Sequence, residues 1–150
     1  MRILLPIDGS RHSAITIDEF LRRPWPSGTQ VEVLSVAVAS PLIAPTRAAQ
    51  TLHFESLEME LSYARRDAED AAARIRSSAP ALEVSAKIAE GSPVDAILAE
   101  AAAWHADLIL MGSHGRGVLL RHLLGSVADT VSRHAPCSVE IVRDRQATAA

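Results

Sequence analysis

Asp107-Leu-Ile-Leu-Met-Gly-Ser-His-Gly115 joins a short apolar run directly to a glycine-bearing loop. The consecutive apolar residues before Gly112 predict a buried strand over residues 107–111. The loop continues to Leu124, and Gly125-Ser126 then opens a predicted helix over residues 126–134 that Pro136 ends. A strand, a long loop and a helix in this order are typical of one unit of a parallel α/β sheet.

The loop itself has the composition of an anion-binding site. Its glycines let the backbone approach an anion closely. Gly125-Ser126 begins a helix whose free N–H groups and dipole favour phosphate, and Arg116 and Arg121 can add positive charge. The alternative is a flexible connection that ends in a helix cap. The loop is long for a strand-to-helix connection, however, and this favours a function.

The rest of the chain repeats the alternation of strand and helix. Short apolar runs predict four further strands, over residues 2–7, 30–38, 82–89 and 138–142. Apolar positions at helical spacing predict three further helices: one from Ser10 or Ser13 to Leu21, one over about 55–78, and one that Gly91-Ser92-Pro93 opens. The segment from Ala39 to about His53, which contains Pro41 and Pro45, is predicted to be a loop.

This pattern predicts the α/β class, with a doubly wound parallel sheet of five strands and helices on both faces. The strand over residues 82–89 alternates more than the others, so we expect it nearer an edge. We expect a single domain over residues 1–150, with a disordered tail from about residue 144.

Two predicted strand ends carry unusual residues. Asp8-Gly9-Ser10 follows the first strand, and Gly112-Ser113-His114-Gly115 follows the fourth. Ligands of doubly wound sheets bind beyond the carboxyl ends of the strands, where the strand order reverses. If the first and fourth strands are neighbours at the reversal, both segments line one crevice.

Composition excludes several other classes of protein. The formal charge is −3 with acids and bases interspersed, which gives no indication of nucleic-acid or membrane-surface binding. Cys137 is the only cysteine, so an internal disulfide and a multi-cysteine metal site are excluded. No apolar run is long enough to span a bilayer, and the start of the chain lacks the pattern of a signal peptide. We therefore expect a cytoplasmic protein.

Three familiar phosphate-binding classes do not fit. The first strand–helix turn lacks the Gly-x-Gly-x-x-Gly of a dinucleotide-binding enzyme, and no Gly-x4-Gly-Lys-[Ser/Thr] of a P-loop NTPase is present. A phosphoacceptor receiver domain needs clustered acids after the first strand and a late lysine. Only Asp8 and the single lysine, Lys87, are available.

Three segments in order resemble the universal stress protein family. They are Ile3–Ser10, Ala106–Gly117 and His134–Val139, and over residues 112–126 the chain has the family's nucleotide-binding pattern Gly-x2-Gly-x9-Gly-Ser without a gap. The resemblance covers nearly the whole chain and implies strand order 3-2-1-4-5. It also implies a homodimer that pairs the strand over residues 138–142 with its counterpart.

Carried over position by position, the resemblance implies an adenine-nucleotide site. Asp8 resembles the acid that contacts the ribose or the metal-phosphate region, and Val36 the residue whose backbone meets the adenine edge. Alternatively, Asp8 is a turn or helix-capping residue, and Val36 and Met111 are plain core residues. The full set of implied site residues is Pro6, Ile7, Asp8, Val36, Met111, Gly112, Gly115, Arg116, Gly117, Gly125, Ser126 and Val127.

The implied cofactor is ATP, ADP or AMP, with Mg²⁺ carried by the nucleotide, and we expect no metal site formed by the protein alone. The expected function is a nucleotide-binding regulatory or sensing module of the stress response. Two alternatives remain open: a dimeric regulatory protein that works without nucleotide, and a slow ATPase or autophosphorylating protein. No efficient catalysis is expected, because no dedicated base is evident in the sequence.

Overall fold

The sheet is parallel throughout and has the order β3-β2-β1-β4-β5, as the resemblance implied. The computed structural model describes residues 1–38, 46–115 and 124–144. The elements in chain order are β1 (Arg2–Ile7), α1 (Arg11–Leu21), β2 (Gln30–Ala37), α2 (Arg47–Ser78), β3 (Glu83–Glu90), α3 (Pro93–Ala103), β4 (Leu108–Gly112), α4 (Ser126–His134) and β5 (Ser138–Val142). The predicted strands are all present, and their ends differ from the prediction by one residue at most.

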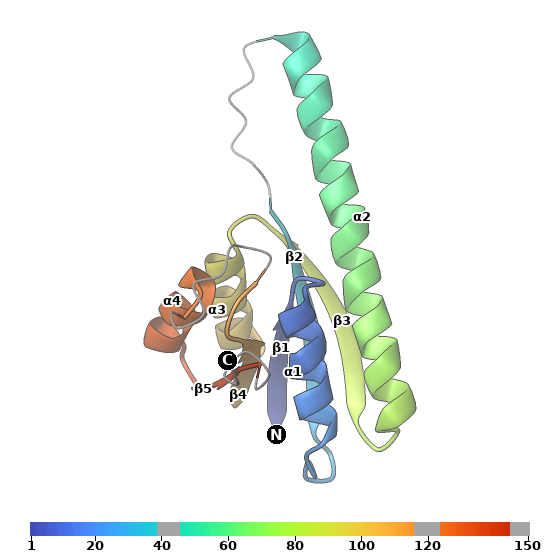
Figure 1. Cartoon of the computed structure of the whole chain (residues 1–150), viewed down its shortest axis with the longest axis vertical. Coiled ribbons are helices and arrows are strands. Elements are labelled where there is room, and N and C mark those ends of the chain that lie inside the picture. The colour runs from blue at the N-terminus through green and yellow to red at the C-terminus, as the bar shows by residue number, and fades with distance from the viewer. Residues whose placement is uncertain (39–45, 116–123, 145–150) are drawn as a thin grey trace.

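Helices cover both faces of the sheet (Figure 1). On one face α1 and α2 pack over Ile3, Leu5 and Ile7 of β1. On the other face α3 and α4 pack over Leu4 of β1 and Leu34 of β2. Successive residues of a strand point to opposite faces, so a central strand covered on both faces must be apolar at nearly every position. This is why β1 reads as a continuous apolar run, whereas β3 at the edge alternates, as predicted. β2 is buried at most positions even though its sequence contains Glu32 and Ser35.

Serine side chains cap two of the helices. The Ser13 amide donates to Ser10 Oγ at 3.3 Å at the start of α1, which decides between the two predicted caps. At α3 the Asp95 amide donates to Ser92 Oγ at 3.4 Å, and Pro93 occupies the first turn. Each serine satisfies an amide that the helix itself cannot pair.

The predicted start of α2 was wrong. The helix begins at Arg47, where the Ala49 amide donates to Thr46 Oγ1 at 3.2 Å, and part of the predicted loop is therefore helical. Its first turns project past the sheet, where Leu52 is 66 % and Phe54 60 % exposed (Figure 1). Because these turns bury no continuous apolar face, the sequence has no helical hydrophobic period there. Pro41 and the rest of the predicted loop, residues 39–45, lie outside the described residues.

The end of the described chain packs against α1. Asp144 lies at the start of the expected tail, yet its carboxylate is 3.0 Å from the Arg11 guanidinium and its side chain is largely buried. Residues 145–150 lie outside the described part. In the described ranges, no helix is long and apolar enough to cross a bilayer.

Candidate functional site

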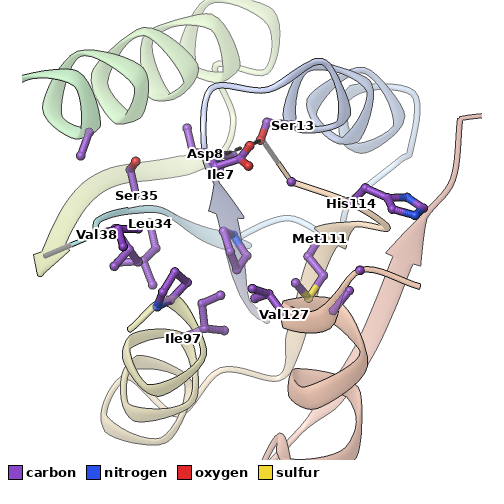
Figure 2. Close-up of a pocket in the computed structure, with 18 of the residues that line it drawn as sticks. Ile7, Asp8, Ser13, Leu34, Ser35, Val38, Ile97, Met111, His114 and Val127 are labelled. Carbon is purple, nitrogen blue, oxygen red and sulfur yellow. Dashed lines mark hydrogen bonds between the residues drawn. The ribbon is translucent and has the colours of Figure 1, made fainter. Parts of the chain in front are cut away.

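A cavity of about 440 Å³ opens at the carboxyl ends of β1, β2 and β4. β1 lies between β2 and β4, so the cavity sits where the strand order reverses, the place where doubly wound sheets bind ligands. Asp8 and Gly115, which follow different strands, both line it, as the shared-crevice argument required. Figure 2 shows side chains from β1, β2, β4, α3 and α4 converging on this space.

The structure brings together every predicted site residue that it describes. The cavity is lined by Pro6, Ile7, Asp8, Val36, Met111, Gly112, Gly115, Gly125, Ser126 and Val127. The remaining two, Arg116 and Gly117, lie outside the described residues, as does Arg121.

Ten further lining residues were not among the predicted site residues: Ser13, Leu34, Ser35, Val38, Glu60, Ala64, Pro93, Ile97, His114 and Ala128. Leu34 could have been found, because it shares a face of β2 with Val36. Ile97 is on the predicted buried face of its helix. Glu60 and Ala64 come from the long α2, and no local pattern indicates that this helix reaches the cavity.

Asp8 is held in one orientation by the start of α1. Its Oδ1 accepts hydrogen bonds from the Ser10 amide at 3.0 Å and from Ser13 Oγ at 2.7 Å. The Asp8 amide in turn donates to Ser13 Oγ at 2.9 Å. The turn role considered for Asp8 is therefore real, and it leaves the carboxylate on the cavity wall (Figure 2).

Gly115 and Gly125 sit where a side chain would not fit. A Cβ on Gly115 would lie 2.6 Å from Asp8 Oδ2, and one on Gly125 would lie 3.0 Å from the Ser113 carbonyl oxygen. The Gly125 amide donates to that same carbonyl at 2.8 Å, which ties the two ends of the loop together. The glycines thus allow the backbone itself to form the cavity wall.

The first turn of α4 supplies the electropositive part of the described wall. Gly125 is the N-cap residue and makes no side-chain cap bond, and Ser126, Val127 and Ala128 of this turn line the cavity. Amides at a helix start attract anions through their unpaired N–H groups and the helix dipole. Among the described lining residues the carboxylates are Asp8 and Glu60, and none is lysine or arginine.

His114 lies at the rim rather than in the centre of the cavity. Its ring is turned aside from the other labelled side chains in Figure 2, with Nδ1 3.0 Å from Ser113 Oγ and the ring centroid 5.3 Å from that of His12. Within the described ranges, no three histidine, cysteine or acidic side chains are grouped so as to hold a metal ion.

Val36 and Met111 combine the two roles that the sequence left open. Met111 is buried in the core beneath α3 and α4, and Val36 packs against the same core. Both also contribute apolar surface to the cavity. In Figure 2 Leu34 and Ile97 lie on one side of the cavity, whereas Met111 lies beside Val127 of α4 on the other side. The side of Leu34 and Ile97 is apolar, while the loop glycines and the free amides at the start of α4 make the other side more polar.

The fold and the cavity define a class: doubly wound α/β proteins with a ligand cavity at the reversal of strand order. The chain belongs to the universal stress protein family, whose family model matches residues 1–143.

Curated relatives carry the same family name. A universal stress protein of Methanocaldococcus jannaschii is 29 % identical over 145 residues, which cover 95 % of this chain and 81 % of the relative. A universal stress protein of Methanothermobacter thermautotrophicus is 39 % identical over 64 residues, and that match spans only 43 % of each chain.

Solved structures share the fold over nearly the whole chain. Hypothetical protein MJ0577 superposes with a TM-score of 0.83 at 24 % identity, covering 96 % of both chains. A universal stress protein from Lactobacillus plantarum has a TM-score of 0.78 at 27 % identity, covering 95 % of this chain and 97 % of that one. A universal stress protein solved in complex with cAMP has a TM-score of 0.67 at 26 % identity, covering 95 % of this chain and 96 % of that one.

Proposed function

We propose that this protein binds an adenine nucleotide, ATP foremost, and acts in the cytoplasm as a regulatory or sensing module of the stress response. One observation carries the proposal. Ten residues that the family pattern assigns to a nucleotide gather around a single cavity at the strand-order reversal. The relative solved with cAMP, a ligand that contains adenine, supports the choice of base.

The two ends of the cavity suit the two ends of a nucleotide. The base would lie against the apolar end, formed by Leu34, Val36 and Ile97. The phosphates would lie against the loop glycines and the first turn of α4, where backbone N–H groups and the Ser126 hydroxyl can donate. A cavity of about 440 Å³ is within the usual size range for such ligands.

Asp8 would contact the ribose or a nucleotide-bound Mg²⁺. Its Oδ1 is engaged by Ser10 and Ser13, so the carboxylate is fixed on the wall. Mg²⁺ prefers carboxylate, phosphate and water oxygens and usually keeps few protein ligands. A single carboxylate beside the phosphates fits an ion that arrives with the nucleotide, which is why we assign Mg²⁺ to the ligand rather than to the protein.

Binding without rapid turnover is the expected activity. Fast hydrolysis needs a base that orients water and charge stabilisation specific to the transition state. We assign Asp8 to the ribose or the nucleotide-bound Mg²⁺ rather than to a water molecule. The other described carboxylate on the wall, Glu60, lies on α2, which covers the opposite face of the sheet from α4. Slow hydrolysis or autophosphorylation would use the same bound state.

We expect ATP to raise the melting temperature of the protein. At a concentration of ~100 times the dissociation constant, a ligand that binds only the folded state stabilises it by roughly 2.7 kcal/mol. For a domain of this size the expected shift is roughly 5–10 °C. Differential scanning fluorimetry with Mg-ATP, ADP, AMP and cAMP measures it, and mass spectrometry of the nucleotide that co-purifies identifies the natural ligand.

Two outcomes would contradict the proposal. Unchanged melting with all four nucleotides would reject nucleotide binding and favour the nucleotide-independent dimer. Turnover of tens of ATP molecules per second would instead make the protein an enzyme.

We further propose that β5 forms a homodimer. In the described sheet β5 is an edge strand, so one side of it has no neighbouring strand, and such edges pair readily with a second copy. Asp144, which follows β5, pairs with Arg11 of its own chain. The contact between the two copies would therefore be formed by the backbone of β5 and not by Asp144.

Light scattering at micromolar concentration should report a dimer. Ile141→Lys on β5 should weaken the dimer, because it places a charge beside the outer edge of the strand; since Ile141 also packs against the core beneath α3 and α4, circular dichroism must show that the variant stays folded. Val84→Lys makes the matched change on the opposite edge strand, β3, and should leave the dimer intact. A wild-type monomer, or dissociation by both changes alike, would argue against the β5 interface.

A further inference from the structure

A buried acid, Glu32, lies on β2 two residues before Leu34, which lines the apolar end of the cavity. Glu32 is only 8 % exposed, and its Oε1 has no hydrogen-bond partner in the described structure. The carboxyl of Glu100 on α3 lies close enough to the Glu32 carboxyl to raise its pKa. Lys87 of β3, the only lysine of the chain, has its Nζ 2.5 Å from Glu100 Oε2.

One positive charge is thus set against two carboxyl groups. Burial raises the pKa of Glu32 to about 7, and the neighbouring Glu100 adds to the rise through a hydrogen bond and its charge, while Lys87 opposes it. Two carboxyl groups can hydrogen-bond to each other only if one of them holds a proton. Below about pH 7 the Glu32 carboxyl therefore holds a proton, and the loss of this proton leaves two negative charges beside a single lysine.

Other charged groups on this face of the sheet are engaged elsewhere. Arg2 of β1 donates to Gln30 Oε1 at 3.2 Å and to the Trp104 carbonyl at 3.0 Å. Glu83 of β3 accepts from Gln30 Nε2 at 2.8 Å. Neither forms a described contact with the pair, so Lys87 is the cation that balances it.

The same two elements form the apolar end of the cavity. Leu34 lines the cavity two residues after Glu32 on β2, on the same face of the strand. Ile97 lines it three residues before Glu100 on α3, on the same face of the helix. Leu34 and Ile97 lie on the same side of the cavity in Figure 2, and the carboxyl groups of Glu32 and Glu100 lie close together on the same two elements.

We propose that Glu32, Glu100 and Lys87 form a proton-linked contact that holds α3 against the sheet, so that release of the Glu32 proton weakens ligand binding in the cavity. The proposal rests on the proposed function, because it assigns a regulation to that same site. α3 contributes Pro93 and Ile97 to the wall, so a shift of this helix changes the part of the cavity assigned to the base.

The sign of the pH dependence follows from the raised pKa. The carboxyl of Glu32 loses its proton near pH 4.5 when the chain is unfolded and near pH 7 when it is folded. The stability that this group contributes is complete below about pH 4.5, falls as pH rises, and is lost above about pH 7. Glu32→Gln has no proton to lose and should abolish this part of the pH dependence.

Melting curves of the ligand-free protein from pH 5 to pH 8.5 test the contact itself. The melting temperature of Glu32→Gln minus that of wild type should increase by roughly 5 °C from pH 5 to pH 8. Lys87→Met should move the wild-type transition to higher pH, because the opposing positive charge is gone. Glu83→Gln is the matched control on the same face and should follow the wild-type curve.

Carbon-13 NMR of the glutamate carboxyls should show one group titrating near pH 7 that is missing from Glu32→Gln.

Titration calorimetry with Mg-ATP tests the effect on the cavity. The ratio of the wild-type dissociation constant to that of Glu32→Gln should be near one at pH 5.5 and about fivefold at pH 8.5. The phosphates of ATP titrate in this range too, but their contribution is common to both proteins and cancels in the ratio.

The possible failures can be told apart. A ratio that does not change with pH, while ATP still binds, would overturn the regulation alone. Parallel melting curves for wild type and Glu32→Gln would overturn the proton-linked contact. If neither wild type nor Glu32→Gln bound ATP at any pH, the proposed function would be overturned, and with it the regulation of ATP binding by pH.

Discussion

Replacing Gly115 by valine should lower the affinity for ATP at least about 100-fold, or by roughly 2.7 kcal/mol of binding free energy. A Cβ at this position would lie 2.6 Å from Asp8 Oδ2, and the valine methyl groups would extend farther into the cavity. The space between the two strand ends would be filled, and Asp8 would be displaced from its serine contacts. Isothermal titration calorimetry measures the affinity, and circular dichroism checks that the variant stays folded.

Gly28→Val is the matched control for this change. Gly28 has a φ of +77°, so a side chain there strains the backbone. Apart from its two chain neighbours, no residue lies within 4 Å of the position that a Cβ would take, and Gly28 does not line the cavity. The control should melt at a lower temperature and keep its full stabilisation by ATP. If Gly115→Val bound ATP with wild-type affinity, the cavity at β1 and β4 would not be the nucleotide site.

Phe20→Ala should produce the largest loss of stability of any change considered. Phe20 is 0 % exposed in the core between α1 and the sheet, and its ring stacks on Trp25 with centroids 5.0 Å apart. Truncation of a buried phenylalanine costs about 3–5 kcal/mol, because the transfer free energy is lost and a cavity remains. We expect the melting temperature to fall by roughly 10–15 °C in scanning calorimetry.

Phe54→Ala makes the same chemical change on an exposed site. Phe54 is 60 % exposed on the projecting part of α2, so its truncation should alter the free energy of unfolding by no more than about 0.5 kcal/mol. Equal losses for the two variants would mean that the turns of α2 around Phe54 are buried in solution, for example in an assembly.

The central strands and the site around them could be predicted because their signals are local. β1 and β4 are apolar at consecutive positions, which only burial on both faces explains. The glycines and serine of the loop stand at fixed spacings in the chain, so the wall built from Gly115 and Gly125 could be inferred before the geometry was known.

The features that escaped prediction depend on contacts between distant segments. Glu32 sits in Val31-Glu32-Val33, a pattern that predicts an acid facing water on a half-buried strand. Its burial becomes understandable only when α3 and β3 bring Glu100 and Lys87 to it. The start of α2 was missed for a different reason: its first turns are helical without burying an apolar face.

The long α2 should not open as one cooperative unit. Ala68, Ala72 and Ile75 in its second half are buried in the core, whereas Leu52 and Phe54 in its first turns are exposed. Amides of the first turns should therefore exchange with solvent through fraying that leaves the rest of the helix intact, while those around Ile75 should exchange only when the whole fold opens. Because Glu60 and Ala64 line the cavity between these two regions, the boundary between easily opened and firmly closed backbone falls at the wall of the binding site.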